Sequence, residues 1–209
     1  MGDDVKADLR AGRVADTEEK ILRAATRLFR EHGYAGTTLT AVAAQARVGA
    51  RTVYVRFGTK AVLLKRVVDV ALVGDTAPVD VQGRSWFVLA GSAPALAERI
   101  DAMARGVREM MARAGDLLAV VLEAAPVEPD LEQAAQAGRE ATRDNMRLFW
   151  TRADDDGLLP AGRDIDWLTE TSAILTSAET YLLGTRMNHW SPEEYEQWLN
   201  NTLTRLVTV

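Results

Sequence analysis

The chain has no cysteine among its 209 residues, and aromatic residues make up only 6% of it. Without cysteine it has no disulfides, no thiolate nucleophile and no cysteine-ligated metal. It also has no run of about 18 apolar residues, the length that a transmembrane helix needs. With 15 glycines and 6 prolines there is little room for long loops, while 47% hydrophobic residues suffice for a sizeable core. These limits favour one or two compact helical domains.

The first residues, MGDDVKADLRAGRVADT, are polar and charged. They are unlike a secretory signal, which has an apolar central region. Together with the lack of cysteine, this pattern predicts a cytoplasmic protein that has no membrane partner. Residues 1–16 also lack helical periodicity, so we expect them to form a mobile arm.

Signals for catalysis or metal binding are weak. The two histidines, His32 and His189, lie far apart and do not form a metal-binding pair at i, i+4 spacing. Ser191, next to His189, is followed three residues later by Glu194, with Pro192 between them, which is the pattern of a capping box at a helix start. The sequence therefore predicts no catalytic residues, no metal, no cofactor and no enzyme activity.

The most informative stretch is residues 38–64, which read TLTAVAAQARVGARTVYVRFGTKAVLL. Its apolar positions predict two short helices joined by a tight turn, with Val42 and Val53 buried and the small Ala43 at the helix crossing. Hydroxyl, cationic, aromatic and apolar side chains point away from this core, and such groups bind phosphates and base edges of DNA. We predict base contacts from Thr40, Arg51, Thr52 and Val55, and phosphate or base contacts from Thr38, Arg47, Tyr54, Arg56 and Lys60.

An amphipathic helix is predicted just before this unit. Apolar residues recur at helical spacing from Thr17 to His32, and Gly33 follows as a C-cap in the left-handed conformation. Glu18 and Glu19 lie in the first turn, where the helix dipole favours acidic residues.

The order of these parts resembles the DNA-binding domain of the tetracycline-repressor (TetR) family of bacterial transcriptional regulators. The resemblance runs from Thr17 to Leu64 without a gap, and its most specific phrase is Thr52-Val53-Tyr54-x-x-Phe57-x-x-Lys60-x-x-Leu63-Leu64. Two positions depart from the family pattern. Arg47 stands where the turn commonly has glycine, and Arg56 stands where an aromatic residue or histidine is more frequent. Arg47 must therefore adopt a strained turn conformation, at a cost of roughly 1 kcal/mol relative to glycine.

The charges are unevenly distributed along the chain. Residues 1–66 hold 13 Lys and Arg and 7 Asp and Glu, a net charge of +6, which leaves 12 basic and 23 acidic residues, or −11, for residues 67–209. The overall charge of −5 thus hides a basic N-terminal part on an acidic remainder. A polyanion such as double-stranded DNA attracts the basic part.

The rest of the chain keeps helical periodicity. We predict an all-α protein with an arm (1–16), a three-helix helix-turn-helix DNA-binding domain (17–64) and a helical ligand-binding and dimerisation domain (65–209). Leu175 to Tyr181 and Trp190 to Leu199 resemble the C-terminal part of an actinobacterial-type branch of the TetR family. The resemblance implies a homodimer, and two apolar stripes support it. Their residues are Ile174, Leu175, Ala178 and Leu182, and Trp198, Leu199, Thr202, Leu203 and Leu206.

The resemblance also implies a pocket for a small-molecule inducer in this domain. The apolar and aromatic candidates for its lining are Trp86, Phe87, Met103, Met110, Leu122, Met146, Phe149, Trp150, Trp167 and Tyr181. They favour an apolar or aromatic ligand. The sequence thus predicts a homodimeric repressor that a ligand releases from a palindromic operator. The alternatives are a ligand-independent regulator or activator on the same fold, and an all-α enzyme or lipid-binding protein.

Overall fold

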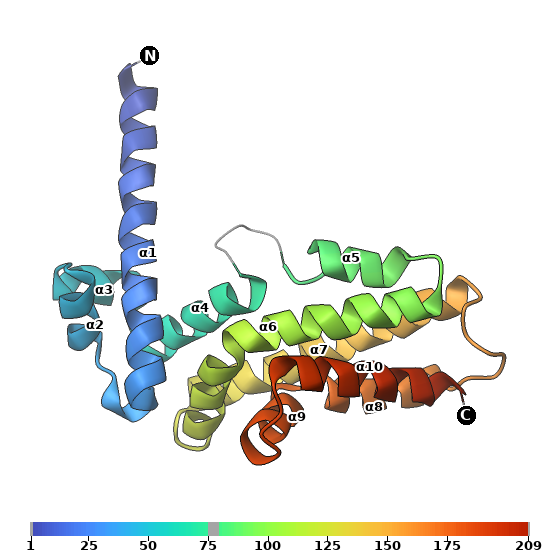
Figure 1. Cartoon of the computed structure of the whole chain (residues 1–209). Helices are drawn as coiled ribbons and strands as arrows, with labels where there is room; N and C mark the ends of the chain where they lie inside the picture. Colours follow the sequence, from blue (N-terminus) through green and yellow to red (C-terminus); the bar gives the residue numbers. More distant parts are fainter. Residues whose placement is uncertain (1, 75–79, 209) are drawn as a thin grey trace. The chain divides into compact units, whose positions relative to one another are not determined.

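The computed structural model describes residues 2–74 and 80–208 of the chain (Figure 1). Within these residues every regular element is a helix and there is no strand, which confirms the predicted all-α class. The helices are α1 (Gly2–Gly36), α2 (Leu39–Ala46), α3 (Ala50–Phe57), α4 (Lys60–Val73), α5 (Ser85–Ser92), α6 (Leu96–Ala124), α7 (Pro129–Asp155), α8 (Ile165–Leu175), α9 (Ala178–Leu182) and α10 (Pro192–Thr208), with a 3-10 turn η1 (Ala125–Val127) and a π-helical turn η2 (Leu183–Met187).

The chain forms two compact units. The first contains the residues up to Asp69 together with Val120–Gln133, and the second contains Val70–Ala119 and Ala134–Val209. The predicted division after Leu64 did not include residues 120–133 in the first unit. The 29-residue helix α6 explains the difference, because one continuous helix of that length contributes to both units.

Helix α1 begins at Gly2, so Thr17 is not its start and residues 2–16 are helical where we expected an arm. This stretch has no proline and contains three alanines and three basic residues, which have good helix propensity. The predicted break at the C-terminal end of this helix is present, because Gly33 has a positive φ of 65° and interrupts the helical geometry. Beyond it, the ring of Tyr34 stacks on Phe29 with a centroid distance of 6.4 Å.

The second unit has its own apolar core, which α5, α6, α7, α8 and α10 surround. Trp150 and Tyr195 are its largest fully buried side chains, each 0% exposed. Trp86 lies so close to α6 at Gly106 that a Cβ atom there would be 2.1 Å from the indole. Glycine at this position therefore allows α5 to approach α6 closely.

In the part of the chain that the structure describes, no helix combines the length and the apolar character required to span a bilayer.

Candidate nucleic-acid interface

The helix-turn-helix forms as predicted, from local signals. Thr38 caps α2, and its hydroxyl accepts a hydrogen bond from the backbone N–H of Ala41 at 3.1 Å. Val42 and Val53 are 0% exposed, and Ala43, at the crossing of α2 and α3, is 2% exposed. Burial of these residues on one side leaves the opposite side of α3 free to meet DNA.

The turn between α2 and α3 has the strained geometry that the sequence predicted. Arg47 has φ 56° and ψ 42°, the left-handed conformation, and its side chain is exposed. The following N–H, of Val48, donates to the carbonyl of Ala43 at 3.0 Å, which closes the helix end in the manner of a Schellman motif. An arginine thus occupies a position where glycine has less strain.

Two substitutions of Arg47 separate this strain from DNA binding. Arg47→Gly removes both the strain and the guanidinium, whereas Arg47→Ala removes only the guanidinium. We expect the free energy of unfolding in urea to be about 1 kcal/mol higher for the glycine variant than for the alanine variant. Equal stabilities would show that the turn is unstrained. If the guanidinium binds phosphate, both variants lose the same DNA affinity.

The predicted base-reading residues are all exposed, and three of them share one face of α3. Thr40, Arg51 and Thr52 are exposed, and Val55 is 78% exposed. Arg51, Thr52 and Val55 stand at i, i+1 and i+4 of α3, so they lie on one side of that helix. Tyr54, which is 50% exposed, lies at the edge of this face. The face combines a guanidinium, hydroxyls and an aliphatic group, which between them can bind guanine, phosphate and the thymine methyl group.

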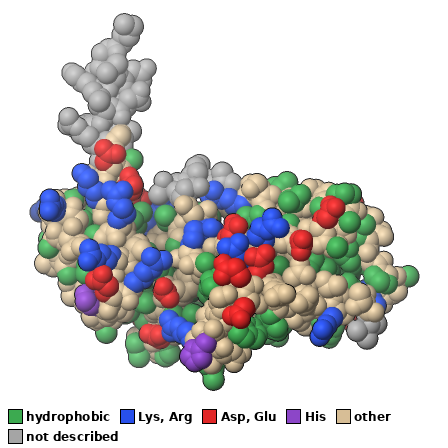
Figure 2. All heavy atoms as spheres, in the orientation of Figure 1, with side chains coloured by type: hydrophobic (Ala, Val, Ile, Leu, Met, Phe, Trp, Pro, Cys, Tyr) green, Lys and Arg blue, Asp and Glu red, His purple; other side chains and the backbone are tan. Residues whose placement is uncertain are grey.

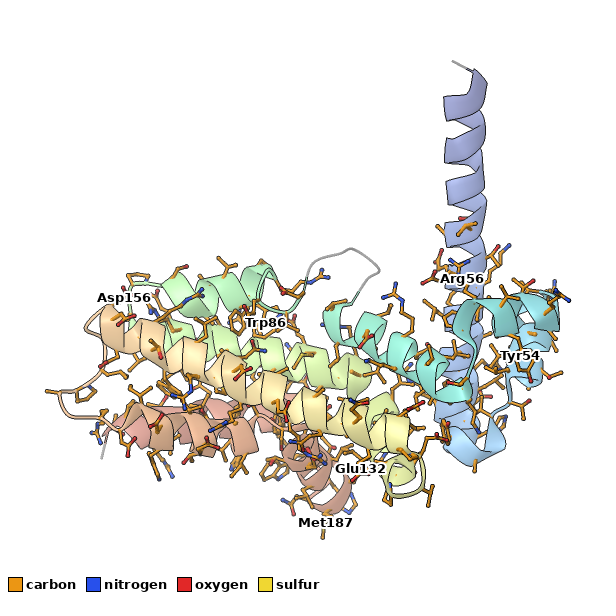
Figure 3. The ribbon with its side chains drawn as sticks, turned by 180° about the vertical axis from the view of Figure 1, so that it is seen from behind. Tyr54, Arg56, Trp86, Glu132, Asp156 and Met187 are labelled. Carbon is orange, nitrogen blue, oxygen red and sulfur yellow. The ribbon has the colours of Figure 1, made fainter. Side chains whose placement is uncertain are left out.

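Arg56 is placed differently from the prediction. Its Nε and Nη2 atoms donate to Oε2 of Glu18 on α1 at 3.1 and 2.5 Å, and Figure 3 shows it beside α1. Oε1 of the same carboxylate accepts from Nε of Arg66 on α4 at 3.2 Å. One acid therefore joins α1, α3 and α4, and the guanidinium predicted to face DNA is engaged within the protein.

Glu18 has a shifted pKa because of these partners. Burial raises the pKa of its carboxyl, but the hydrogen bonds and charges of Arg56 and Arg66 outweigh that effect and bring it below the ordinary value. The ionised carboxylate therefore stabilises the fold above its ordinary pKa. This stabilisation is lost as the pH falls through the lowered pKa.

Lys60, a predicted phosphate contact, lies at the start of α4. Its ammonium donates to the carbonyl of Tyr34 at 2.5 Å and sits 4.0 Å from the centre of the Tyr34 ring. Burial lowers the pKa of Lys60, and the nearby charge of Glu128 opposes that shift. The hydroxyl of Tyr34 in turn donates to Glu128 at 2.8 Å. An ammonium has three donors, so Lys60 keeps capacity for a phosphate.

Sequence reasoning missed the joining roles of Glu18 and Glu128. Glu18 and Arg56 are 38 residues apart, and Tyr34 and Glu128 are 94 apart, so no local spacing signals either pair. Sequence reasoning also missed Thr37, a buried residue whose hydroxyl donates to the carbonyls of Leu28 and Gly33. Among the residues that the structure describes, no group of three or more His, Asp or Glu side chains is arranged to hold a metal ion.

Charged side chains are distributed over both units. On the face in Figure 2, Lys and Arg side chains are spread over α1 and the neighbouring helices of the first unit, with Asp and Glu side chains among them. On the second unit, acidic and basic side chains lie interleaved along the helices (Figure 2). The basic groups of the first unit belong to the helices that carry the helix-turn-helix, as attraction of DNA requires.

The predicted dimer stripes divide into exposed and buried residues. Ile174 is 67% exposed, but Leu199 and Leu203 are 0% exposed because they pack into the core of their own unit, so they are not available to a partner. The remaining members, Leu175, Ala178, Leu182, Trp198, Thr202 and Leu206, are half-buried. Three further apolar residues are exposed in residues 165–187 and were missed for this surface: Trp167 (52%), Leu183 (55%) and Met187 (70%).

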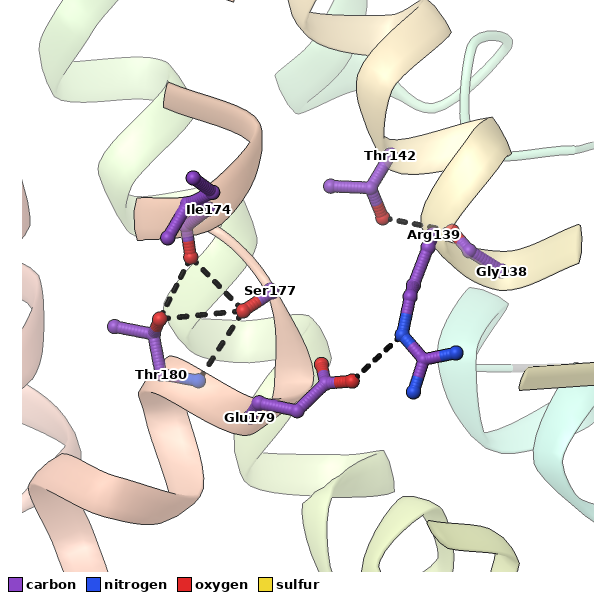
Figure 4. Close-up of polar contacts among 7 residues, drawn as sticks. All are labelled: Gly138, Arg139, Thr142, Ile174, Ser177, Glu179 and Thr180. Atoms are coloured by element: carbon purple, nitrogen blue, oxygen red, sulfur yellow. Dashed lines mark hydrogen bonds and ion pairs between the residues drawn. The ribbon is translucent and has the colours of Figure 1, made fainter. Parts of the chain in front are cut away.

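The junction of α8 and α9 is held firmly in place (Figure 4). Ser177 caps α9 by accepting from the N–H of Thr180 at 3.2 Å, and the hydroxyl of Thr180 donates to the carbonyl of Ile174 at 2.6 Å. Nε of Arg139 on α7 donates to Glu179 at 2.8 Å. Ile174 is therefore exposed to solvent on a segment that hydrogen bonds and an ion pair hold in place.

Most of the predicted pocket residues lie in the core of the second unit. Phe87, Met103, Met146, Phe149, Trp150 and Tyr181 are buried there, and Trp86 and Met110 pack against them half-buried. Two residues do not belong with them. Trp167 is 52% exposed on the outer side of α8, and Leu122 falls in residues 120–133 of the first unit. Thr169 on α8 is also buried, and its hydroxyl has no hydrogen-bond partner among the described residues.

Comparison with known proteins agrees with this geometry. Residues 21–67 match the sequence profile of the family described as bacterial regulatory proteins, tetR family. The match covers α2 and α3 and the adjoining parts of α1 and α4. No curated protein sequence is significantly similar to the chain.

Solved structures resemble the chain over nearly its whole length. The SmeT–triclosan complex is 20% identical with a TM-score of 0.70, and the match covers 90% of each chain. NalD, the secondary repressor of the MexAB-OprM multidrug efflux pump in Pseudomonas aeruginosa, is 20% identical, with 91% and 96% coverage and a TM-score of 0.67. A TetR transcription regulator from Haloarcula marismortui is 19% identical, with 92% and 97% coverage and a TM-score of 0.68. At these identities the likeness establishes a shared fold.

Proposed function

We propose that this chain, which belongs to the TetR family of bacterial regulatory proteins, binds double-stranded DNA sequence-specifically through α3 and thereby regulates transcription. The single observation that carries the proposal is the outward face of α3, where Arg51, Thr52 and Val55 are exposed while Val53 and Phe57 anchor the helix in the core. A helix held in this way fits the major groove and can read base edges there. Thr38, Tyr54 and Lys60 would bind the flanking phosphates.

The protein acts, in this proposal, as a homodimer on a palindromic operator. One eight-residue recognition helix reads few base pairs, so tight specific binding needs two copies on half-sites about one helical turn apart. Support comes from the exposed apolar residues of α8 and η2, where Trp167 and Ile174 are seven residues apart and Leu183 and Met187 four apart. Exposed apolar groups at such spacing are typical of an association surface.

A charge on this surface should separate the two copies. We expect Ile174→Glu to weaken dimerisation by at least about 2 kcal/mol, or about 30-fold, because a two-fold axis brings two buried carboxylates into one interface. Sedimentation at several protein concentrations measures the change. Val88→Glu is the matched control, since Val88 is also an exposed apolar residue (51%) but lies on α5. If both variants and the wild type sediment alike, the dimer interface does not include Ile174.

A small apolar or aromatic ligand would release the protein from DNA, which would make it a repressor. The core of the second unit supports this proposal, because its aromatic and methionine side chains suit such a ligand and the unpartnered hydroxyl of Thr169 can orient a polar group. The triclosan complex of SmeT and the repressor role of NalD are further support. Activation of transcription, or regulation without a ligand, is the alternative on the same fold.

The deciding experiment is a gel shift with the DNA that flanks the chain's own gene, followed by footprinting. We expect a protected, two-fold symmetric site that is bound at least about a thousandfold more tightly than random DNA at the same salt concentration. Equal affinity for all sequences would overturn specific regulation. Triclosan, added as a probe, tests whether a ligand releases the protein from DNA. A gel shift that stays unchanged at saturating triclosan would argue against release.

A further inference from the structure

The recognition helix carries two arginines in opposite situations. Arg51 is exposed, whereas the side chain of Arg56 is only 27% exposed and makes two hydrogen bonds to Glu18. Arg56 follows Thr52 by four residues, so it lies one turn farther along α3, on the flank of the reading face. A free guanidinium at this position, beside the reading face, would be within reach of a backbone phosphate.

Glu18 is well placed to hold this guanidinium. Its side chain is 23% exposed, and its carboxylate uses both oxygens, Oε2 for Arg56 and Oε1 for Arg66. All three side chains belong to the first unit. A carboxylate and a phosphate offer a guanidinium the same paired acceptors, so they compete for it. The neighbouring Glu19 makes a different pair, with the exposed Arg23 on its own helix.

We infer that Glu18 withholds Arg56 from DNA, so that this one carboxylate limits how tightly the recognition helix grips the phosphate backbone of any sequence. The inference rests on the proposed DNA-binding function. Its consequence is a higher ratio of specific to non-specific binding. A phosphate contact strengthens binding to all sequences alike, and withholding it leaves discrimination to Arg51, Thr52 and Val55.

The test compares Glu18→Gln with Glu19→Gln in the full-length protein. Both variants lose one negative charge at adjacent positions of α1, but only the first releases Arg56. We expect Glu18→Gln to bind random DNA more tightly and to steepen the salt dependence by about 0.9 per subunit. For a dimer, the factor by which Glu18→Gln binds random DNA more tightly than the wild type would then fall about 12-fold between 50 and 200 mM salt. Glu19→Gln should leave the slope unchanged.

Two further variants identify the cation and keep the test valid should Glu18→Gln fold poorly. In the double variant Glu18→Gln/Arg56→Gln, the gain in affinity for random DNA should disappear. If the gain persists, it belongs to Arg66, and the inference is overturned. Arg56→Gln alone should bind random DNA within about twofold of wild type with the same slope. A slope reduced by about 0.9 per subunit would show that Arg56 already binds phosphate and would also overturn the inference.

These outcomes are distinct from failure of the proposed function. If the wild-type protein binds no DNA at low salt, DNA binding itself is refuted, and the role of Glu18 with it. If the wild type binds its operator but Glu18→Gln gains no more affinity than Glu19→Gln, only the inference about Glu18 fails. Urea unfolding of each variant, measured at the temperature of the binding assay, shows that the molecules compared are folded.

Discussion

Trp150→Ala is expected to lower the free energy of unfolding by about 3–5 kcal/mol, because it removes the largest buried side chain from the core of the second unit. Trp150 is 0% exposed, its indole N–H donates to the hydroxyl of Ser172 at 2.8 Å, and its ring meets Phe149 edge-on at a centroid distance of 4.7 Å. A loss of this size is a large part of the typical stability of a protein domain. Urea denaturation followed by far-ultraviolet circular dichroism measures it.

Conservative variants at the same contact separate packing from hydrogen bonding. Trp150→Phe keeps most of the ring and loses the N–H, while Ser172→Ala leaves the indole N–H buried without a partner. We expect each to cost about 1–3 kcal/mol, clearly less than alanine at position 150. A cost below about 1 kcal/mol for Trp150→Ala would show that the surroundings close around the missing ring and would contradict tight packing around Trp150.

Arg51→Ala is expected to reduce the affinity for the operator by about 1–3 kcal/mol while leaving binding to random DNA nearly unchanged. Arg51 is exposed near the start of α3, and its guanidinium can donate two hydrogen bonds to O6 and N7 of a guanine. The measurement is the ratio of operator to random-DNA affinity at fixed salt. The expected loss in this ratio is about 5-fold to 150-fold.

The matched control for this prediction is Lys65→Ala. Lys65 is an exposed cation of α4 in the same unit, outside the predicted contacts, so its loss should change both affinities slightly and equally. If Arg51 instead binds phosphate, its substitution lowers both affinities together and leaves their ratio unaltered. That result would contradict the base-reading role and leave Thr52 and Val55 as the readers on α3.

Local signals were sufficient for the elements of the helix-turn-helix. The cap at Thr38, the break at Gly33 and the left-handed turn at Arg47 each depend on residues within about five positions of one another. The same holds at the start of α10. The N–H of Ser191 donates to the carboxylate of Glu194, and the N–H of Glu194 donates to the hydroxyl of Ser191. Such short-range interactions are visible in a sequence because the partners have a fixed spacing.

The sequence by itself thus determined the helical class, the position of the recognition helix and its outward residues, whereas the tertiary structure decided which of those residues are free. Periodicity places Leu199 and Ile174 on apolar stripes, but only packing distinguishes the buried Leu199 from the exposed Ile174. The side chain of Arg56 was predicted to face DNA, and the fold pairs it with Glu18. The physical reason is that periodicity depends on backbone geometry alone, while burial and ion pairing depend on segments that meet only when the chain folds.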